Sequence, residues 1–261
     1  MKLADRVCVI TGGARGIGEA IATRFAAEGA TVAILDLDRS AAETTAGRLG
    51  ATAYQCDVSS RGSVENAVNA VLYAHGRIDV LCNNAGIGLA GPSETFSDED
   101  WNTSIGVMQT GVFHCSQIVG RHMLERGHGT IVNTSSMNAW EAFPMRLAYC
   151  AAKAAVVAMT QVLAIEWADR GIRVNAVAPG VTRTALVQKG IDDGVIDVVA
   201  YRARTPMHRF AEPDEIARAV LFLACDEDSS FVTGTTLCID GGWSAMGWIY
   251  KEDEGQAQPA R

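Results

Sequence analysis

The stretch Val7-Cys-Val-Ile-Thr-Gly-Gly-Ala-Arg-Gly-Ile-Gly18 decides the fold of this 261-residue chain. The apolar run 7–10 predicts a buried strand, and the alanine-rich segment from residue 17 predicts a helix. Glycines between them let the backbone turn tightly and approach a ligand, and a helix N-terminus attracts anions. The alternative is a tight strand-to-helix turn without a ligand, because the spacing is not G-x-G-x-x-G. The context favours a pyrophosphate site that includes Gly12, Arg15, Gly16, Ile17 and Gly18.

Short apolar runs alternate with longer helical patterns along the rest of the chain. We expect strands at 7–10, 31–35, 80–82, 130–132, 173–177 and 236–239. We expect helices near 17–28, 40–49, 61–75, 98–125, 147–169 and 212–224. This alternation is typical of a parallel sheet that is covered by helices on both faces. Right-handed crossovers then predict an α/β fold with a single doubly wound, Rossmann-like domain.

The domain organisation follows from the absence of repeats, linkers and shifts in composition. We predict one domain over residues 1–250. The segment 184–211 is mixed, charged and interrupted by Gly190 and Gly194, so we interpret it as an excursion that forms a substrate lid. The polar residues 251–261 are predicted to form a C-terminal tail.

Composition excludes several classes of function. The chain has 30 acidic and 22 basic residues and a formal net charge of −8, which opposes binding to nucleic acid or to an anionic membrane. We expect no membrane span, because no run approaches the roughly 20 apolar residues required, and no secretory signal. Seven cysteines without a C-x-x-C pair suggest free thiols, and the expected location is the cytoplasm. No metal-ligand spacing is visible.

Asp36 follows the second expected strand, eighteen residues after Gly18. A carboxylate at this place can accept hydrogen bonds from the adenosine ribose hydroxyls and repels the additional phosphate of NADP. Asp36 therefore favours NAD as the cofactor, although Arg15 and Arg39 lie close enough in sequence to tolerate a phosphate. The alternative is an acid at the exposed end of a strand.

Tyr149 and Lys153 are four residues apart and therefore share one face of a helix. A phenol with a pKa of about 10 is a weak base at neutral pH, but a nearby ammonium group favours the phenolate. The phenolate can then remove the proton of an alcohol. Ser136, just after the expected strand 130–132, has a hydroxyl that can hold the substrate oxygen. The alternative is an ordinary pair on an exposed helix beside a loop serine.

Together these motifs resemble the short-chain dehydrogenase/reductase family, in their order and in their spacing. The resemblance extends from Ala4 to about Trp243 and rests on Thr-Gly-x-x-x-Gly-x-Gly at 11–18, Asn-Asn-Ala-Gly at 83–86, Ser136, Tyr149-x-x-x-Lys153 and Pro179-Gly180. It implies that Asp57 and Val58 contact the adenine and that Asn84 lies along the cofactor. It also implies that Lys153 binds the nicotinamide ribose, that Val181 and Thr184 hold the carboxamide, and that the protein is a homotetramer.

Met108 departs from the pattern of this family. The resemblance places an asparagine at this position in many members, where it completes a catalytic tetrad and holds a water of the proton relay. A thioether is a weak acceptor and cannot donate a hydrogen bond. Three interpretations stay open: other groups such as Gln109 hold the water, proton exit is slower, or the protein is a poor enzyme.

The expected substrate pocket combines residues that follow Ser136 with the excursion 184–211 and the C-terminal region. Asn138 and Arg146 offer hydrogen bonds, and Trp140 offers a flat apolar surface. Further candidates are Glu141, Gln188, Lys189, Asp192, Asp193, Arg202, Arg204, Trp243, Met246 and Trp248. Polar groups beside tryptophan suit a small sugar, polyol or hydroxy acid, although many of these charges are equally compatible with a solvated lid surface.

The sequence therefore predicts an NAD-dependent dehydrogenase of carbohydrate metabolism that oxidises a secondary alcohol or a sugar hemiacetal. One alternative is an NADPH- or NADH-dependent carbonyl reductase, for example of 3-oxoacyl thioesters. Asp36 and the acidic surface argue against it, because such reductases generally use NADPH and an acidic carrier would be repelled. Another alternative is a dinucleotide-binding scaffold with weak catalysis, which only Met108 favours.

Overall fold

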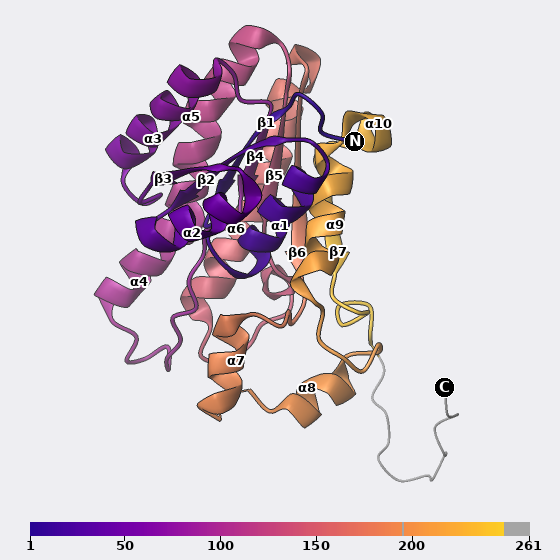
Figure 1. The fold of residues 1–261 in the computed structure, drawn as a ribbon. Coiled ribbons are helices and arrows are strands. Elements are labelled where there is room, and N and C mark those ends of the chain that lie inside the picture. The colour runs from indigo at the N-terminus through magenta and orange to yellow at the C-terminus, as the bar shows by residue number, and fades with distance from the viewer. Residues whose placement is uncertain (195, 248–261) are drawn as a thin grey trace.

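The computed structural model describes residues 1–194 and 196–247 and contains a seven-stranded parallel sheet (Figure 1). Its strand order is β3-β2-β1-β4-β5-β6-β7. The strands are β1 (Val7–Thr11), β2 (Thr31–Asp36), β3 (Thr52–Gln55), β4 (Val80–Asn83), β5 (Gly129–Thr134), β6 (Ile172–Pro179) and β7 (Thr236–Ile239). The strand order reverses between β1 and β4, where sheets of this type bind ligands beyond the carboxyl ends of the strands. The predicted doubly wound, Rossmann-like fold is confirmed.

Helices cover both faces of the sheet, and each face has its own apolar core. One face carries α1 (Gly16–Ala27), α2 (Arg39–Leu49) and α9 (Pro213–Ala224). The other carries α3 (Arg61–His75), α5 (Gly111–Arg126) and α6 (Leu147–Trp167). Phe25 and Ile216 are buried in the first core, and Val119 and Trp167 in the second. The central strands are buried on both sides, which explains their near-continuous apolar runs.

Two local features differ from the expected elements. Strand β3 was not predicted, because its four residues are mostly half-buried and do not form an apolar run. The expected helix 98–125 consists of α4 (Asp98–Ile105), a π-helical turn (Gly106–Thr110) and α5. This turn cannot be read from the sequence, because the helical pattern continues through it.

The lid segment forms two short helices, α7 (Ala185–Asp192) and α8 (Val198–Arg204). They lie together beyond the carboxyl ends of the strands, apart from the main body (Figure 1). Neither helix has a buried residue. After α9 the chain forms α10 (Asp226–Ser229) and β7. The predicted tail 251–261 and Trp248 lie outside the described residues.

Helix α6 is more apolar than we expected. Within the described part of the chain, Leu147–Arg170 is long and apolar enough to cross a membrane by length and composition, so our expectation that no segment would pass this test was wrong. Core helices pass the same test. The buried face of α6 carries Lys153 and Thr160, and its contacts with β5 and β6 make it a core helix of the sheet.

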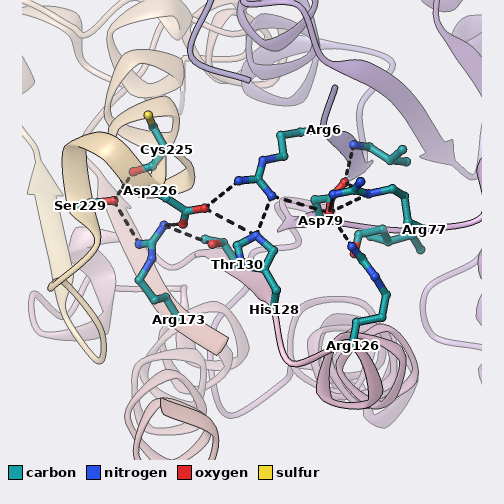
Figure 2. A network of polar contacts seen from close by, with 12 residues as sticks. Arg6, Arg77, Asp79, Arg126, His128, Thr130, Arg173, Cys225, Asp226 and Ser229 are labelled. Atoms are coloured by element: carbon teal, nitrogen blue, oxygen red, sulfur yellow. Dashed lines mark hydrogen bonds and ion pairs between the residues drawn. The ribbon is translucent and has the colours of Figure 1, made fainter. Parts of the chain in front are cut away.

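The amino edge of the sheet is held by a charged network (Figure 2). Asp79, directly before β4, is almost fully buried and is bound by Arg77, by Arg126 and by the backbone N–H of Val7. Arg6 links this carboxylate to Asp226 of α10. The residues that complete the network are His128, Thr130, Arg173 and Ser229. The network joins the starts of the central strands on the side opposite to the predicted active site.

Candidate active site

The predicted catalytic residues meet at the carboxyl end of β5. Ser136 lies two residues beyond this strand, and Tyr149 and Lys153 lie in the first two turns of α6. The Lys153 Nζ atom donates to the carbonyl of Thr134 at 2.8 Å and lies 5.7 Å from the centroid of the Tyr149 ring. The Ser135 hydroxyl donates to the Lys153 carbonyl at 2.9 Å, which ties the helix to the strand. Strand and helix thus position the three side chains together.

Asn138 positions the Ser136 hydroxyl. The backbone N–H of Asn138 donates to Ser136 Oγ at 3.1 Å, and Ser136 Oγ donates to Asn138 Oδ1 at 3.4 Å. The Asn138 Nδ2 atom donates to the carbonyl of Glu141 at 3.0 Å. Both ends of the Asn138 amide are therefore engaged within their own loop. We predicted Asn138 as a substrate contact; the structure shows it supporting the serine.

Burial dominates the electrostatics of the site. Burial lowers the pKa of Lys153 to about 8. Burial also raises the pKa of Tyr149, while the Ser136 hydroxyl and the charge of Arg146 act in the opposite direction. We expected Lys153 to lower the pKa of the tyrosine, but the dominant influence is the burial of Tyr149, which raises that pKa. Arg146 is the cation that favours the phenolate in this structure.

Met108 and Lys153 both approach Gly86. Met108 is fully buried and lies in the π-helical turn Gly106–Thr110. Its Cγ atom and the Lys153 Nζ atom each lie 3.9 Å from the position that a Cβ on Gly86 would take. The thioether therefore stands where the family resemblance places an amide. The structure shows no side-chain hydrogen bond of Gln109 in the described residues that would replace that amide.

The glycine-rich turn has the close packing that a dinucleotide loop requires. A Cβ on Gly18 would lie 2.0 Å from the carbonyl oxygen of Gly12, and one on Gly12 would lie 2.8 Å from the Cα of Ala85. Only glycine fits these two places. The Asn84 Nδ2 atom donates to the carbonyls of Thr11 and Gly12 at 3.2 and 3.0 Å. Asn84 therefore braces this turn against the end of β4.

The start of α1 leaves backbone donors available for an anion. The first N–H groups of a helix have no acceptors within the helix. Arg15, at the N-cap, provides no side-chain cap, and Gly16, Ile17 and Gly18 form the first turn. These donors, together with the close-packed glycines, fit the pyrophosphate of a nicotinamide dinucleotide.

Asp36 ends β2 beside this turn. One of its carboxylate oxygens accepts the backbone N–H of Ala14 at 3.0 Å, and the other accepts that of Asp38 at 3.0 Å. Each oxygen keeps a second lone pair for a ribose hydroxyl. The carboxylate of Asp38 forms an ion pair with Arg15 at 2.7 Å.

The remaining predicted cofactor residues lie on both sides of the same edge. Asp57 Oδ1 accepts the N–H and the hydroxyl of Ser59, and Val58 is buried against Gly111. The Val181 carbonyl accepts the N–H of Ala211 at 2.9 Å. Thr184 caps α7, and its Cγ2 atom lies 3.5 Å from the position of a Cβ on Gly16. The lid thus begins beside the phosphate turn.

The substrate side is built from segments far apart in sequence. Trp140 is half exposed, and Arg146 donates to the carbonyl of Gly88 at 3.2 Å. Sequence reasoning named Trp243 but missed the aromatic cluster that it forms with Phe143 and Tyr201, whose ring centroids lie 5.6 to 6.0 Å apart. These rings join the loop after Ser136, helix α8 and the C-terminal region. No local pattern reveals them, because each contact depends on where the lid folds.

Comparisons with known proteins match this geometry. A family described as Enoyl-(Acyl carrier protein) reductase matches residues 12–244. The chain is 42% identical to D-threitol dehydrogenase of Mycolicibacterium smegmatis, over 93% of this chain and 94% of that protein. It is 41% identical to 3-oxoacyl-[acyl-carrier-protein] reductase FabG of Thermotoga maritima, over 93% and 99%.

A solved structure shows the same fold with a bound dinucleotide. The 3-ketoacyl-(acyl-carrier-protein) reductase from Brucella melitensis complexed with NADH has a TM-score of 0.87 and 36% identity, over 93% of this chain and 99% of that chain. The three predicted catalytic residues and the glycine-rich turn agree with this similarity. The chain is therefore a member of the short-chain dehydrogenase/reductase family, an enzyme family of oxidoreductases that use nicotinamide dinucleotides.

Proposed function

We propose that this chain is an NAD-dependent alcohol dehydrogenase that oxidises a secondary hydroxyl, or a sugar hemiacetal, of a small sugar, polyol or hydroxy acid. Tyr149 acts as the base that takes the hydroxyl proton, and Ser136 holds the substrate oxygen. Lys153 binds the nicotinamide ribose and contributes positive charge. NAD, when bound, accepts the hydride.

The end of β2 is the observation that carries the choice of NAD. Asp36 is held by two backbone N–H groups at a place where it would repel a ribose phosphate. The two arginines that could attract this phosphate are already paired, Arg15 with Asp38 and Arg39 with Glu43, each at 2.7 Å. Carboxylates thus neutralise the local positive charge that NADP requires.

The substrate class is supported by the pocket and by one relative. Trp140, four residues after Ser136, offers a half-exposed flat surface that suits a small molecule, and D-threitol dehydrogenase is a polyol dehydrogenase by name. The competing proposal is a carbonyl reductase, such as one for 3-oxoacyl thioesters. The similarity to FabG and to the NADH-bound reductase favours it, and the net charge of −8 opposes an acidic carrier.

We also propose that the protein is a cytoplasmic homotetramer that binds neither nucleic acid nor membranes. All seven cysteines are free. Exposed apolar side chains on α5, α6 and β7 support the assembly, namely Phe113, Val162, Ile165 and Leu237. Light scattering should give the mass of four chains, and Ile165→Glu should reduce that mass. A wild-type monomer would contradict this assembly.

A substrate screen tests the proposed function. Sugars, polyols, hydroxy acids and hydrophobic alcohols are each supplied with NAD or NADP, and 3-oxoacyl thioesters with NADH or NADPH. We expect turnover of a polar alcohol, with at least tenfold preference for NAD. Activity confined to hydrophobic alcohols would refute the polar substrate, and faster thioester reduction would favour the reductase. Tight NADH binding without any turnover would support a scaffold.

A further inference from the structure

Two hydrogen bonds connect the loop after β4 to the segment that leads into α6. Arg146 Nη1 donates to the carbonyl of Gly88 at 3.2 Å, and the N–H of Gly91 donates to the carbonyl of Met145 at 3.0 Å. We call this pair of contacts the bridge. Because β4 and β5 are neighbours, the bridge joins the segments that follow these two strands, at the edge of the sheet that carries Ser136 and Tyr149.

The bridge includes a residue in an unfavourable backbone conformation. Met145 has a φ of 64°, in the left-handed region that non-glycine residues seldom adopt. Such conformations persist where the surrounding contacts determine them, and they concentrate at functional sites. The carbonyl of Met145 is one of the two acceptors in the bridge. Met145 therefore belongs to the turn that directs the Arg146 side chain toward Gly88.

The lid rests on the same loop. A Cβ on Gly88 would lie 3.1 Å from Leu186 Cδ2 and 3.4 Å from Leu186 Cδ1, so the leucine occupies the space that the glycine leaves. Leu186 belongs to α7, which has no buried residue. Leu186 is itself mostly exposed, so its contact with Gly88 is one of the few that hold this helix, beside that of Thr184 with Gly16. The carbonyl of Gly88 is the group that Arg146 binds on the other side.

Arg146 also lies on the same helix start as Tyr149, the proposed base. It is the N-cap residue of α6, three residues before Tyr149. Its positive charge favours the phenolate of Tyr149, whose pKa burial otherwise raises. One side chain therefore contacts the support of the lid and influences the proton acceptor of the reaction.

We propose that Arg146 is a positioning residue that holds Gly88 as the seat of Leu186, and so couples closure of the lid to the charge around Tyr149. Its role at the lid does not depend on the reaction. Its role at Tyr149 rests on the proposed dehydrogenase function. The two roles need separate measurements, so that failure of one is distinguishable from failure of the other.

Limited proteolysis tests the lid. An endoprotease that cuts after lysine has few targets, because the chain contains only Lys2, Lys153, Lys189 and Lys251. Lys189 is exposed in α7, whereas Lys153 is buried. We expect Arg146→Gln and Leu186→Ala each to accelerate cleavage after Lys189 about tenfold, and the double variant to add less than twofold, because both release the same contact.

Arg170→Gln is the matched control, because Arg170 also donates to a backbone carbonyl, at the other end of α6. It should leave cleavage unchanged. Gly88→Ala provides a second route, since the added Cβ crowds the end of the Leu186 side chain without touching the arginine, and it should accelerate cleavage in the same direction as Leu186→Ala but less. Unchanged cleavage in Arg146→Gln, or in both Leu186→Ala and Gly88→Ala, would overturn the lid role.

The pH profile of alcohol oxidation tests the role at Tyr149. The reaction needs the phenolate, so kcat/KM rises with pH through the apparent pKa of the tyrosine. Loss of the positive charge in Arg146→Gln should move this midpoint upward by roughly half to one pH unit. Arg146→Lys keeps the charge and should keep the midpoint near that of the wild type. An unchanged midpoint in Arg146→Gln would overturn this role, even if its lid is loosened.

Discussion

At the amino edge of the sheet, the carboxylate of Asp79 is surrounded by the guanidinium groups of Arg6, Arg77 and Arg126 (Figure 2). At the carboxyl edge, the ammonium group of Lys153 has one carbonyl partner, that of Thr134, and no ion pair in the described residues. Both charged groups are buried. Burial raises the pKa of Asp79, but Arg77 and its other partners outweigh burial and hold that pKa below its usual value. Burial alone lowers the pKa of Lys153 to about 8.

We call the amino edge around Asp79 the structural edge and the carboxyl edge around Lys153 the functional edge. The two edges differ in whether the chain itself supplies the partners of a buried charge. A buried charge stabilises a fold only when its partners replace the water it has lost. Asp79 has such partners within the chain. Lys153, the oxygens of Asp36 and the first N–H groups of α1 retain bonding capacity that the chain does not use. We interpret this unused capacity as the part of the molecule reserved for the cofactor and substrate.

The largest effect should come from removing the phenol at the functional edge. Tyr149→Phe deletes the proposed base, and kcat should fall by about 10³-fold or more. Stability should change little, because this hydroxyl has no role in the core packing, and the affinity for NADH should stay within a few-fold. Steady-state kinetics measure kcat, and NADH fluorescence measures the affinity. A variant that keeps a tenth of the wild-type activity would show that Tyr149 is not the base.

Asp79→Asn should give the opposite result at the structural edge. The variant leaves several arginines without their shared carboxylate, and the free energy of unfolding should fall by about 3 kcal/mol. The kinetic constants of the folded enzyme should stay unchanged. Asp214→Asn is the control, because the ion pairs of Asp214 with Arg24 and Arg218 are partly exposed and should contribute less than about 1 kcal/mol. Urea unfolding at one protein concentration measures both variants.

Asp36→Asn tests whether the carboxylate oxygens of Asp36 bind the adenosine ribose at the functional edge. The substitution keeps the shape but weakens both the ribose contact and the repulsion of a phosphate. The ratio of kcat/KM for NAD to that for NADP should fall about 10- to 100-fold. Asp38→Asn, which frees Arg15 from its ion pair, should lower the ratio less. A ratio that does not change in Asp36→Asn would place the discrimination elsewhere.

The sequence predicted the local geometry of the glycine-rich turn better than the contacts around the expected substrate pocket. The turn around Gly12 and Gly18 and the carboxylate of Asp36 depend on short stretches, because a strand, its turn and the next helix start are local. Strand β3 escaped prediction because its residues are neither apolar nor alternating. The π-helical turn around Met108 was hidden by a helical pattern that continues on both sides.

The substrate side depends on contacts between distant segments. Phe143 meets Tyr201 and Trp243 only after the lid has folded, and Leu186 finds Gly88 across nearly one hundred residues. Asn138 was predicted to face the substrate, but its amide binds Ser136 and Glu141. Side-chain polarity alone cannot tell whether a loop residue serves a ligand or another residue of the loop.

The smallest effect is expected for Lys153→Met, which tests the difference between the two edges directly. If the buried ammonium group lacks sufficient partners, its removal should raise the free energy of unfolding. Lys153→Met removes an ammonium group whose burial costs about 3 kcal/mol at neutral pH, and it leaves the Thr134 carbonyl unpaired at a cost of about 1 kcal/mol. The cofactor-free variant should therefore be about 1 to 2 kcal/mol more stable than the wild type at pH 7, although it loses turnover.

This advantage should depend on pH in a defined direction. Below pH 8 the lysine is protonated in the folded and unfolded states, and the full cost of burial is present. Between about pH 8 and 10.5 the unfolded chain binds more protons than the folded protein, so the wild type gains stability as pH rises. Methionine does not titrate, so the advantage of Lys153→Met should shrink across this window and reverse above it, where the unpaired Thr134 carbonyl is the cost that remains. Urea unfolding at pH 7 and pH 10 measures the stability of both proteins. A variant that is less stable than the wild type at pH 7 would mean that the partners of Lys153 compensate its burial as fully as those of Asp79 do.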